Sequence, residues 1–479
     1  MVFSGLTFLL LFFPAVIVLS LLSRRLTYQN YMLLAVSLLF YAWGEPKWVL
    51  AMLVVAAINY LCALPLQKDS LSSGLRRLLL AVAVLGSLSF LFYFKYAAFF
   101  LNTVGSLLGR GKMMETPVLP IGISFYTFQA LTYTVDVYRG KAPAQRNPLK
   151  LLLYISCFPQ LIAGPIVQYA DIADQLDHRK ITVDGYLTGF RRFTVGLAKK
   201  VLLANFCGAV LLEVDTAAQG PLTFVGAWLS CILFSMQIYF DFSAYSDMAI
   251  GIGRMLGFRY KENFNYPYIA CSVTDFWRRW HISLGSFFRD YVYIPLGGNR
   301  KGPARQIVNL MIVWGLTGLW HGANWNYLMW GLIHGILVIA EKFVWKKEPQ
   351  GAMRIVRRVL SMFVILLSMA TFYYEDLSQL LAHVLAYFGL GLENGILTTV
   401  PFIDEKRLLL LGKYALPLCA MLFFCTPVLR NLAARWERRD QERPCGYSIA
   451  AGLTSVALLA LSLIYLIGQS YNPFIYFRF

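Results

Sequence analysis

The chain has 479 residues, of which 58% are hydrophobic and only 14% are charged, and its formal net charge is +18. Soluble domains carry roughly a quarter charged residues, and no segment of domain size here has such a composition. The excess of lysine and arginine does not indicate a nucleic-acid partner, because these residues occupy short loops between long apolar runs. The composition therefore excludes a soluble enzyme and a nucleic-acid-binding protein, and it indicates a protein embedded in a lipid membrane.

Apolar runs recur from one end of the chain to the other, and many are long enough to cross about 30 Å of hydrocarbon as a helix. We expect an all-α polytopic membrane protein in which the shorter runs are re-entrant or buried. The runs are residues 6–22, 31–43, 48–66, 78–96, 118–137, 151–169, 222–236, 307–320, 328–344, 359–372, 408–428 and 449–469.

The basic residues gather in clusters that predict which loops face the cytoplasm, because short cytoplasmic loops are enriched in lysine and arginine. Arg24 and Arg25 follow a single apolar run, so the N-terminus is expected outside, and that run is expected to be a retained helix, not a cleaved signal peptide. The tail 472–479 is then also outside, which implies an even number of crossings. The clusters are residues 24–25, 68–77, 278–305, 346–358 and 430–443.

Eight cysteines are present, and none forms a Cys-x-x-Cys pair. Most lie within apolar runs, where cysteine behaves as a small buried apolar residue. Cys271 and His281, the closest cysteine and histidine along the chain, lack the spacing of metal ligands. We therefore expect neither a disulfide framework nor a metal site.

Three segments interrupt the apolar runs with polar or basic residues. Residues 119–129 add Ser, Thr and Gln to a membrane helix, where such side chains usually bridge neighbouring helices. Residues 161–166 contain Gly-Pro and break a helix in mid-membrane, which is tolerated only where protein or water receives the freed backbone groups. Residues 186–214 alternate apolar and basic side chains at helical spacing, which predicts an amphipathic helix at the cytoplasmic interface.

The middle third carries most of the polar chemistry. Asp241 ends an apolar run, and three roles are open to it: a helix cap, an ion pair with an arginine, or the orientation of a histidine. The aromatic and amide-rich residues 257–268 predict a loop. Residues 295–302 predict a basic turn with free backbone amides, which suits contact with phosphate but matches no Walker motif.

The five histidines differ in their expected roles. His178 lies in a basic polar loop and is expected to be solvated, and His383 lies on an amphipathic stretch near the interface. His334 lies inside an apolar run, where a hydrogen-bonded structural role and a functional role are equally open. His321 ends a run just before a turn, where an imidazole with one nitrogen held by a partner suits a general base. His281 is flanked by arginines that disfavour its imidazolium form, so it is expected to donate or to orient.

No other catalytic signature occurs in the chain. It has no Gly-x-Ser-x-Gly elbow, no His-Glu-x-x-His motif, no P-loop and no dinucleotide fingerprint. Ionisable groups at membrane depth are costly and are therefore functional candidates. The chemistry indicated is histidine-assisted transfer within the membrane, and the basic cytoplasmic surface suits a phosphorylated donor.

An ordered set of motifs resembles the membrane-bound O-acyltransferase (MBOAT) family, and within it the bacterial branch that O-acetylates polysaccharides. The central motifs are Phe276-Trp-Arg-Arg-Trp-His-Ile-Ser-Leu284, Arg289-Asp-Tyr-Val-Tyr-Ile294, Leu296-Gly-Gly-Asn-Arg300 and Gly318-Leu-Trp-His-Gly-Ala-Asn-Trp325. Residues 1–4, 119–125, 136–140, 158–165, 239–250 and 474–479 fit as well. The resemblance runs nearly the whole length of the chain and is highly specific.

The resemblance implies a ring of roughly ten to twelve transmembrane helices around a central funnel, with re-entrant and interfacial helices. It implies a single integral-membrane acyltransferase domain over residues 1–479, with a catalytic core at about 230–345. His321 matches the catalytic histidine of the family and His281 its second signature histidine. The residues expected to contact the donor are Arg278, Arg279, Trp280, Arg300 and Lys301, and those expected to support the site are Asp241 and Asn324.

The function that the resemblance implies is the transfer of an acetyl group from cytoplasmic acetyl-CoA, with no permanently bound cofactor. The acceptor is then a cell-surface polysaccharide, reached through an extracytoplasmic acetyltransferase partner, and the chain is a multi-pass protein of the bacterial inner membrane. Two alternatives are another MBOAT reaction, such as D-alanylation of teichoic acid, and a non-enzymatic transporter or flippase. The absence of an internal repeat disfavours the transporter.

Two departures from the family pattern bear on specificity. Residues 370–376 lack the arginine that relatives often carry in the corresponding region, and Asn205 stands where aspartate is commoner. Neither change touches the central motifs. They put partner docking or acceptor choice in doubt, so alginate is not assumed to be the acceptor.

Overall fold

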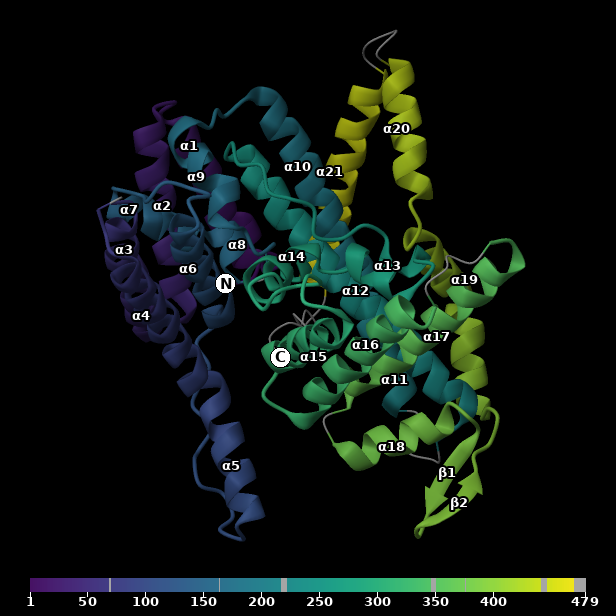
Figure 1. Ribbon diagram of the computed structural model, residues 1–479. Helices are drawn as coiled ribbons and strands as arrows, with labels where there is room; N and C mark the ends of the chain where they lie inside the picture. The colour runs from purple at the N-terminus through teal and green to yellow at the C-terminus, as the bar shows by residue number, and fades with distance from the viewer. Residues whose placement is uncertain are drawn as a thin grey trace.

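The computed structural model describes residues 1–68, 70–162, 164–216, 222–345, 350–374, 376–440 and 446–468. The described chain is almost entirely helical (Figure 1), which confirms the expectation of an all-α membrane protein. Its one hairpin pairs β1 (Leu390–Glu393) with β2 (Ile396–Thr399), antiparallel, with Leu390 opposite Thr399. Cys445 and the tail motif 474–479 lie outside the described residues.

The helices follow one another through short connections, and several are interrupted by a π-helical turn. The α-helices are α1 (Phe13–Leu21), α2 (Leu26–Gly44), α3 (Val49–Leu66), α4 (Ser73–Leu91), α5 (Ala97–Leu107), α6 (Ile123–Tyr138), α7 (Pro148–Ser156), α8 (Phe158–Leu161), α9 (Tyr169–His178), α10 (Val183–Ala198), α11 (Asn205–Thr216), α12 (Phe224–Met255), α13 (Val273–Arg279), α14 (Ile282–Phe288), α15 (Pro303–His321), α16 (Trp325–Phe343), α17 (Ala352–Tyr373), α18 (Leu377–Ala386), α19 (Glu405–Phe424), α20 (Val428–Asp440) and α21 (Gly446–Ile467). The π turns are η1 (Phe8–Phe12), η3 (Phe92–Tyr96), η4 (Lys199–Ala204) and η6 (Arg289–Tyr293), and the 3-10 turns are η2 (Pro46–Trp48) and η5 (Pro267–Ile269).

Seven helical segments of the described chain are long and apolar enough to cross a membrane, by length and composition. Shorter apolar helices at Phe8–Leu21 and Leu377–Ala386 accompany them, so the protein is polytopic. The seven are Pro46–Leu66, Ser73–Leu107, Val183–Thr216, Phe224–Met255, Ala352–Tyr373, Glu405–Phe424 and Ser448–Ile467.

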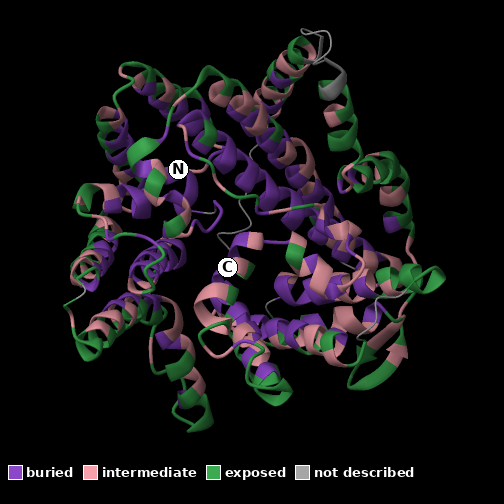
Figure 2. Ribbon diagram, turned by 45° about the horizontal axis from the view of Figure 1, so that its top comes forward, coloured by how far each residue is buried: buried purple, intermediate pink, exposed green. Residues whose placement is uncertain are grey.

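The long helix α12 forms the centre of the fold, where buried residues concentrate (Figure 2). Helix α10 packs along it through small residues. A Cβ atom on Gly189 would lie 2.6 Å from the backbone oxygen of Gly251, and one on Gly196 would lie 2.8 Å from that of Ala244. Only glycine permits this approach, which is the usual way membrane helices pack closely. Residues 183–216 also form one of the candidate spans, so the expectation that residues 186–214 lie at the membrane interface is wrong.

The basic residues of this helix face acidic residues on α12, and this explains the error. Arg192 and Lys199 both pair with Asp247, each at 2.6 Å. Lys200 pairs with Asp241 at 2.8 Å, and both side chains are buried. The helical spacing of these charges predicts a stripe that faces lipid headgroups, but in the structure the charges form an internal network. Of the three roles open to Asp241, the structure shows an ion pair, with a lysine in place of an arginine.

The expected break at residues 161–166 is present. Helix α8 ends at Leu161, and the backbone N–H of Ile166 donates to the Ser283 hydroxyl at 3.0 Å. Protein thus receives a backbone group freed by the break, as the membrane environment requires. The polar bridging expected of residues 119–129 is not seen for Thr127 and Gln129, whose side-chain polar atoms are buried without a hydrogen-bond partner in the described chain. A polar bridge from α6 comes instead from Thr134, which donates to the side-chain oxygen of Asn59 at 2.7 Å.

Candidate active site

Helices α15 and α16 form a tight hairpin that fixes the position of His321. A Cβ atom on Gly318 would lie 2.3 Å from the Tyr327 backbone oxygen, and one on Gly331 would lie 2.3 Å from that of Trp314. The two helices therefore touch backbone to backbone at glycine. His321 is the last residue of α15, and Gly322 leaves the helix in an extended conformation.

The His321 ring is held at one nitrogen, and no partner for the other nitrogen occurs among the residues that the structure describes. Its Nδ1 lies 2.7 Å from the backbone oxygen of Thr317. A carbonyl oxygen only accepts hydrogen bonds, so Nδ1 carries the proton and Nε2 presents a lone pair. The rings of Trp320, Trp330 and Phe372 pack edge-on around the imidazole, with centroids at 4.9, 5.0 and 5.3 Å. This packing fixes the ring plane in a buried, aromatic setting.

His281 has the same arrangement, reached by a different backbone. It caps α14 in the left-handed region, with φ of 45°, a conformation that is strained for a residue other than glycine and often marks a functional position. Its Nδ1 lies 3.2 Å from Asn263 Oδ1. The backbone N–H of Ser283 also donates to that atom, at 3.1 Å, so the atom is the amide oxygen and Nδ1 donates to it. Within the described chain, Nε2 of His281 is buried and unpartnered.

Both histidines lie against the indole ring of Trp320. The Trp320 ring centroid is 5.7 Å from that of His281 and 4.9 Å from that of His321. His281 lies in the turn between α13 and α14, outside the candidate spans, and its burial lowers the pKa of the imidazole well below its usual value, with a further contribution from His321. Burial, and not the flanking arginines, is thus the main reason that the imidazolium form is disfavoured.

The five residues expected to contact a donor separate into two groups. Arg279 pairs with Asp275 at 2.9 Å and donates to the backbone oxygen of Asn265 at 3.3 Å, so it ties α13 to the preceding loop. Trp280 is buried and stacks on Phe276 with centroids 5.5 Å apart. The contacts of these two side chains are therefore with the protein itself. The other three, Arg278, Arg300 and Lys301, are exposed, and no partner for them occurs among the residues that the structure describes.

Arg300 and Lys301 lie far from His321. They directly precede α15, and His321 is at the other end of that helix of 19 residues, which corresponds to about 28 Å at 1.5 Å per residue. They are able to contact only a part of a donor that is remote from the reacting atoms.

The π turn η6, which precedes these residues, is anchored, because Arg139 donates to the Asp290 backbone oxygen at 2.8 Å. Partial burial alone would raise the pKa of Asp290, but hydrogen bonds from Arg289 outweigh it and hold the pKa below its usual range.

The remaining histidines are satisfied or solvated. His334 accepts a hydrogen bond from Trp277 Nε1 at 3.2 Å on Nδ1 and donates from Nε2 to the Ser368 hydroxyl at 3.0 Å. Both of its nitrogens are occupied, which favours the structural role. His178 is exposed and pairs with Asp174 at 2.8 Å. His383 is partly buried, and its ring stacks on Tyr374 at 3.8 Å.

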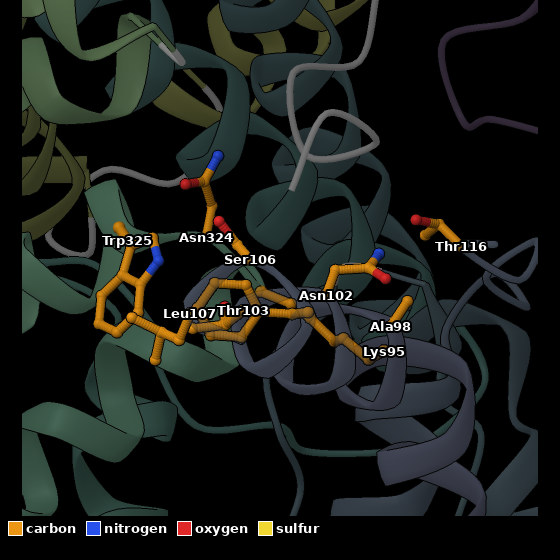
Figure 3. A pocket seen from close by; sticks show the side chains of 11 residues that line it. Lys95, Ala98, Asn102, Thr103, Ser106, Leu107, Thr116, Asn324 and Trp325 are labelled. Carbon is orange, nitrogen blue, oxygen red and sulfur yellow. The ribbon is translucent and has the colours of Figure 1, made fainter. Parts of the chain in front are cut away.

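A pocket of 720 Å³ opens beside the end of α15. In Figure 3, Asn324 from the turn before α16 and Trp325, the first residue of α16, lie on one side of it, and Lys95 from η3 and Asn102 from α5 lie on the other. Asn324 is the N-cap position of α16, yet its side chain makes no capping hydrogen bond. It lines the pocket.

Sequence reasoning missed three residues of this region. Thr317 and Asn263 set the tautomers of the two histidines through a backbone oxygen and a side-chain amide, and no sequence pattern identifies such partners. Lys95 had a usable signal, because it is the single charged residue of the apolar run 78–96. An isolated cation within a span is a functional candidate by the same rule that selected the histidines.

Sequence comparison places these features within a known family. Residues 141–374 match the membrane-bound O-acyltransferase family. The chain is 36% identical to the probable alginate O-acetylase of Azotobacter vinelandii over 100% of both proteins. It is 29% identical to the peptidoglycan O-acetyltransferase of Helicobacter pylori over 93% of this chain and 91% of that protein. It is 28% identical to the teichoic acid D-alanyltransferase of Bacillus subtilis, over 48% of this chain and 60% of that protein.

The fold and the matched sequence together define an acyltransferase embedded in a membrane. The chain belongs to the membrane-bound O-acyltransferase family. The alternative of a non-enzymatic transporter is therefore wrong.

Proposed function

We propose that this acyltransferase moves an acetyl group from acetyl-CoA on the cytoplasmic side to a hydroxyl group of a cell-surface polysaccharide on the other side. The long similarity to an alginate O-acetylase and to a peptidoglycan O-acetyltransferase supports acetyl as the acyl group and a polysaccharide as the acceptor. The bacterial relatives support a place in the bacterial inner membrane. An extracytoplasmic acetyltransferase is the proposed partner that completes the transfer.

The observation that carries the proposal is the fixed tautomer of His321. Since Nδ1 donates to the Thr317 carbonyl, Nε2 is free to take the proton of an acceptor hydroxyl. The hydroxyl oxygen then attacks the thioester carbonyl, the carbon–sulfur bond breaks, and the thiolate of coenzyme A receives the proton from His321. The aromatic rings packed around the imidazole hold it in this orientation.

His281 is proposed to orient the donor. Its Nε2 also presents a lone pair, so it accepts a hydrogen bond from an N–H or O–H group and does not donate one to the thioester carbonyl. The arm of coenzyme A carries amide N–H groups that suit this position. This narrows the earlier expectation, in which donation and orientation were both open.

The basic residues are proposed to bind the donor at two depths. Arg278, Arg300 and Lys301 are free to contact the phosphates of coenzyme A, whereas Arg279 and Trp280 shape the wall near His281. Asp241 supports the site from the core through its pair with Lys200. Acetyl-CoA is a substrate in this scheme, and no bound cofactor takes part.

The test is acetyl transfer in sealed inside-out vesicles of the native membrane, which contain the protein together with its proposed extracytoplasmic partner. Radiolabelled acetyl-CoA is added outside, on the cytoplasmic face, and label is measured on polyuronate or peptidoglycan inside. Wild type is compared with His321→Ala and with His178→Ala, an exposed histidine that serves as the matched control. We expect label with wild type and His178→Ala only. Transfer by His321→Ala at the wild-type rate would refute the assignment of the base.

A second acyl group follows from the relative that carries D-alanine. Its similarity covers only 48% of this chain, so acetyl is favoured. Vesicles supplied with a carrier protein charged with radiolabelled D-alanine separate the two reactions. Transfer of D-alanine without transfer of acetyl would replace the proposal with D-alanylation.

A further inference from the structure

Lys95 is a cation within a membrane span, and the backbone around it is unusual. It lies in the π turn η3, inside the candidate span Ser73–Leu107. The neighbouring Phe92 and Tyr93 are exposed on the outer surface, as expected for lipid-facing residues, whereas Lys95 lines the pocket. A π turn inserts one residue into a helix and often occurs at functional sites. Here it sets the lysine on the protein side.

The ammonium group reaches the end of α15. Its Nζ donates to the backbone oxygen of Trp320 at 2.5 Å and lies 5.9 Å from the centre of the Trp320 ring. Trp320 immediately precedes His321, and the charge of Lys95 is close enough to act on that imidazole. The hydrogen bond satisfies one of the free carbonyls at a helix C-terminus, where a cation is favourable. This capping uses one N–H of three.

The other N–H groups of Lys95 have no acceptor, and the ammonium has no carboxylate, in the described part of the chain. The contrast is Lys200, a buried lysine whose charge is paired with Asp241 at 2.8 Å. Charged groups at membrane depth face a partner or a water-filled cavity. Lys95 faces the pocket, so its remaining donors are directed to whatever occupies that space.

The pocket that Lys95 faces has a rigid wall. The side-chain oxygen of Asn102 accepts the backbone N–H groups of Met113 and Met114, at 2.8 and 2.9 Å, and its nitrogen donates to the Met114 oxygen. These bonds hold the loop after α5 against the helix. Together with Asn324 and Trp325, they form a fixed passage from the molecular surface to Lys95. The passage carries amides and hydroxyl groups, which suits a hydroxyl-bearing acceptor.

We propose that Lys95 is a catalytic residue that binds the attacking oxygen of the acceptor, which enters through this pocket. The inference rests on the proposed function. As the acceptor O–H bond breaks and its proton passes to Nε2 of His321, negative charge develops on the oxygen. Two N–H groups of Lys95 stabilise that charge while the new carbon–oxygen bond forms and the bond to sulfur breaks. Lys95 keeps its proton throughout.

The test removes the ammonium and then returns it in solution. Acetyl transfer from acetyl-CoA to a polyuronate oligosaccharide is measured in native membrane vesicles that retain the proposed partner and are made permeable to both substrates, for wild type, Lys95→Ala and His321→Ala. We expect Lys95→Ala to lower kcat by about 100- to 1,000-fold, as the loss of a donor to a developing oxyanion does, with the KM for acetyl-CoA within about threefold of wild type. Ethylammonium should raise the rate of Lys95→Ala by at least about tenfold, because the truncated side chain leaves room for it beside the pocket. Tetramethylammonium, which has the charge but no N–H, should restore none.

The outcomes separate the proposal from its rivals. Full activity of Lys95→Ala, or equal rescue by tetramethylammonium, would overturn the role as hydrogen-bond donor. If Lys95→Ala does not fold, Lys95→Met keeps the side-chain volume, and its loss of kcat at an unchanged thermal midpoint is then the expected result. A Lys95→Met protein with wild-type kcat would overturn the proposal. Lys112→Ala, which alters an exposed lysine paired with Glu115 at 2.6 Å, is the matched control. If His321→Ala transfers acetyl at the wild-type rate, the proposed function fails, and not only the role of Lys95.

Discussion

His321 and His334 lie in one aromatic cluster, with ring centroids 5.0 and 4.9 Å from that of Trp330. Both are buried. They differ in their hydrogen bonds within the described chain: His334 has partners at both nitrogens, Trp277 and Ser368, whereas His321 has one only at Nδ1, a backbone oxygen. Burial and aromatic surroundings therefore do not distinguish a structural histidine from a reactive one. The free lone pair does.

The same distinction separates Lys95 and Lys200, two lysines that lie within candidate spans. Lys200 is neutralised by Asp241, and the pair joins the helix that follows α10 to α12. Lys95 has a backbone carbonyl as its acceptor and faces a pocket. A buried polar group with all its partners contributes to the fold, and removing one partner costs stability. A group with unused bonding capacity facing a cavity is available to a substrate. We therefore expect substitution of His321 or Lys95 to reduce activity, and substitution of Lys200 or His334 to reduce stability.

The largest effect is expected for His321→Asn. Asparagine keeps a polar side chain but offers no basic nitrogen, so the acceptor hydroxyl loses its base. A general base contributes about 100- to 10,000-fold, and we expect kcat to fall by about 1,000-fold or more with a thermal midpoint close to that of wild type. Acetyl transfer and thermal unfolding of the purified protein are measured together. A protein that loses stability but keeps its kcat would make His321 a second structural histidine and would erase the comparison.

Lys200→Met should act on stability. It leaves the buried carboxylate of Asp241 without its charge partner, and breaking a buried pair in this way costs about 3–5 kcal/mol. The double variant Lys200→Met with Asp241→Leu removes both charges and should regain most of the loss. Thermal midpoints in detergent check both. If the single variant unfolds at the wild-type temperature, the pair is not what joins these helices.

A smaller loss of stability is expected for His334→Leu. Leucine fills a similar volume, but Trp277 Nε1 loses its acceptor and the Ser368 hydroxyl loses its donor. An unsatisfied buried group costs about 1–3 kcal/mol. The rate per folded molecule should stay within about fivefold of wild type, measured as kcat after correction for the folded fraction. A fall in kcat as large as that of His321→Asn would show that the occupied nitrogens do not protect this residue from a catalytic role.

The distinction between open and saturated groups could not be made from the sequence. The motif around His321 and the isolated position of His334 were visible, and the first pointed to catalysis by resemblance to the family. The hydrogen bonds of His334 come from α13 and α17, which are separated from it by 57 and 34 residues. Tertiary packing alone brings them together, so two roles were left open for His334.

The predictions made from the pattern of charged residues were the least reliable. The basic stripe of residues 186–214 has the spacing of an interfacial helix, but its partners Asp241 and Asp247 lie on α12. Spacing along one helix does not reveal what faces it. The apolar runs, by contrast, overlap every candidate span of the described chain except Val183–Thr216, because crossing a membrane requires length and hydropathy, and both are local properties of the sequence.

The smallest effect is expected for the double variant Arg300→Gln with Lys301→Gln. Like Nε2 of His321, these cations have no partner among the described residues, but they are exposed and lie about 28 Å from His321 along α15. Exposed charge contacts are weak and are screened by salt. We therefore expect the KM for acetyl-CoA to rise by less than about tenfold, with kcat unchanged and the difference from wild type disappearing at high salt. Kinetics at two ionic strengths measure this, with Lys112→Gln as a matched exposed lysine outside the basic turn. A fall in kcat of about 100-fold would mean that an open group need not be buried or near His321 to act on the reaction, and the comparison would then have to include distant charge.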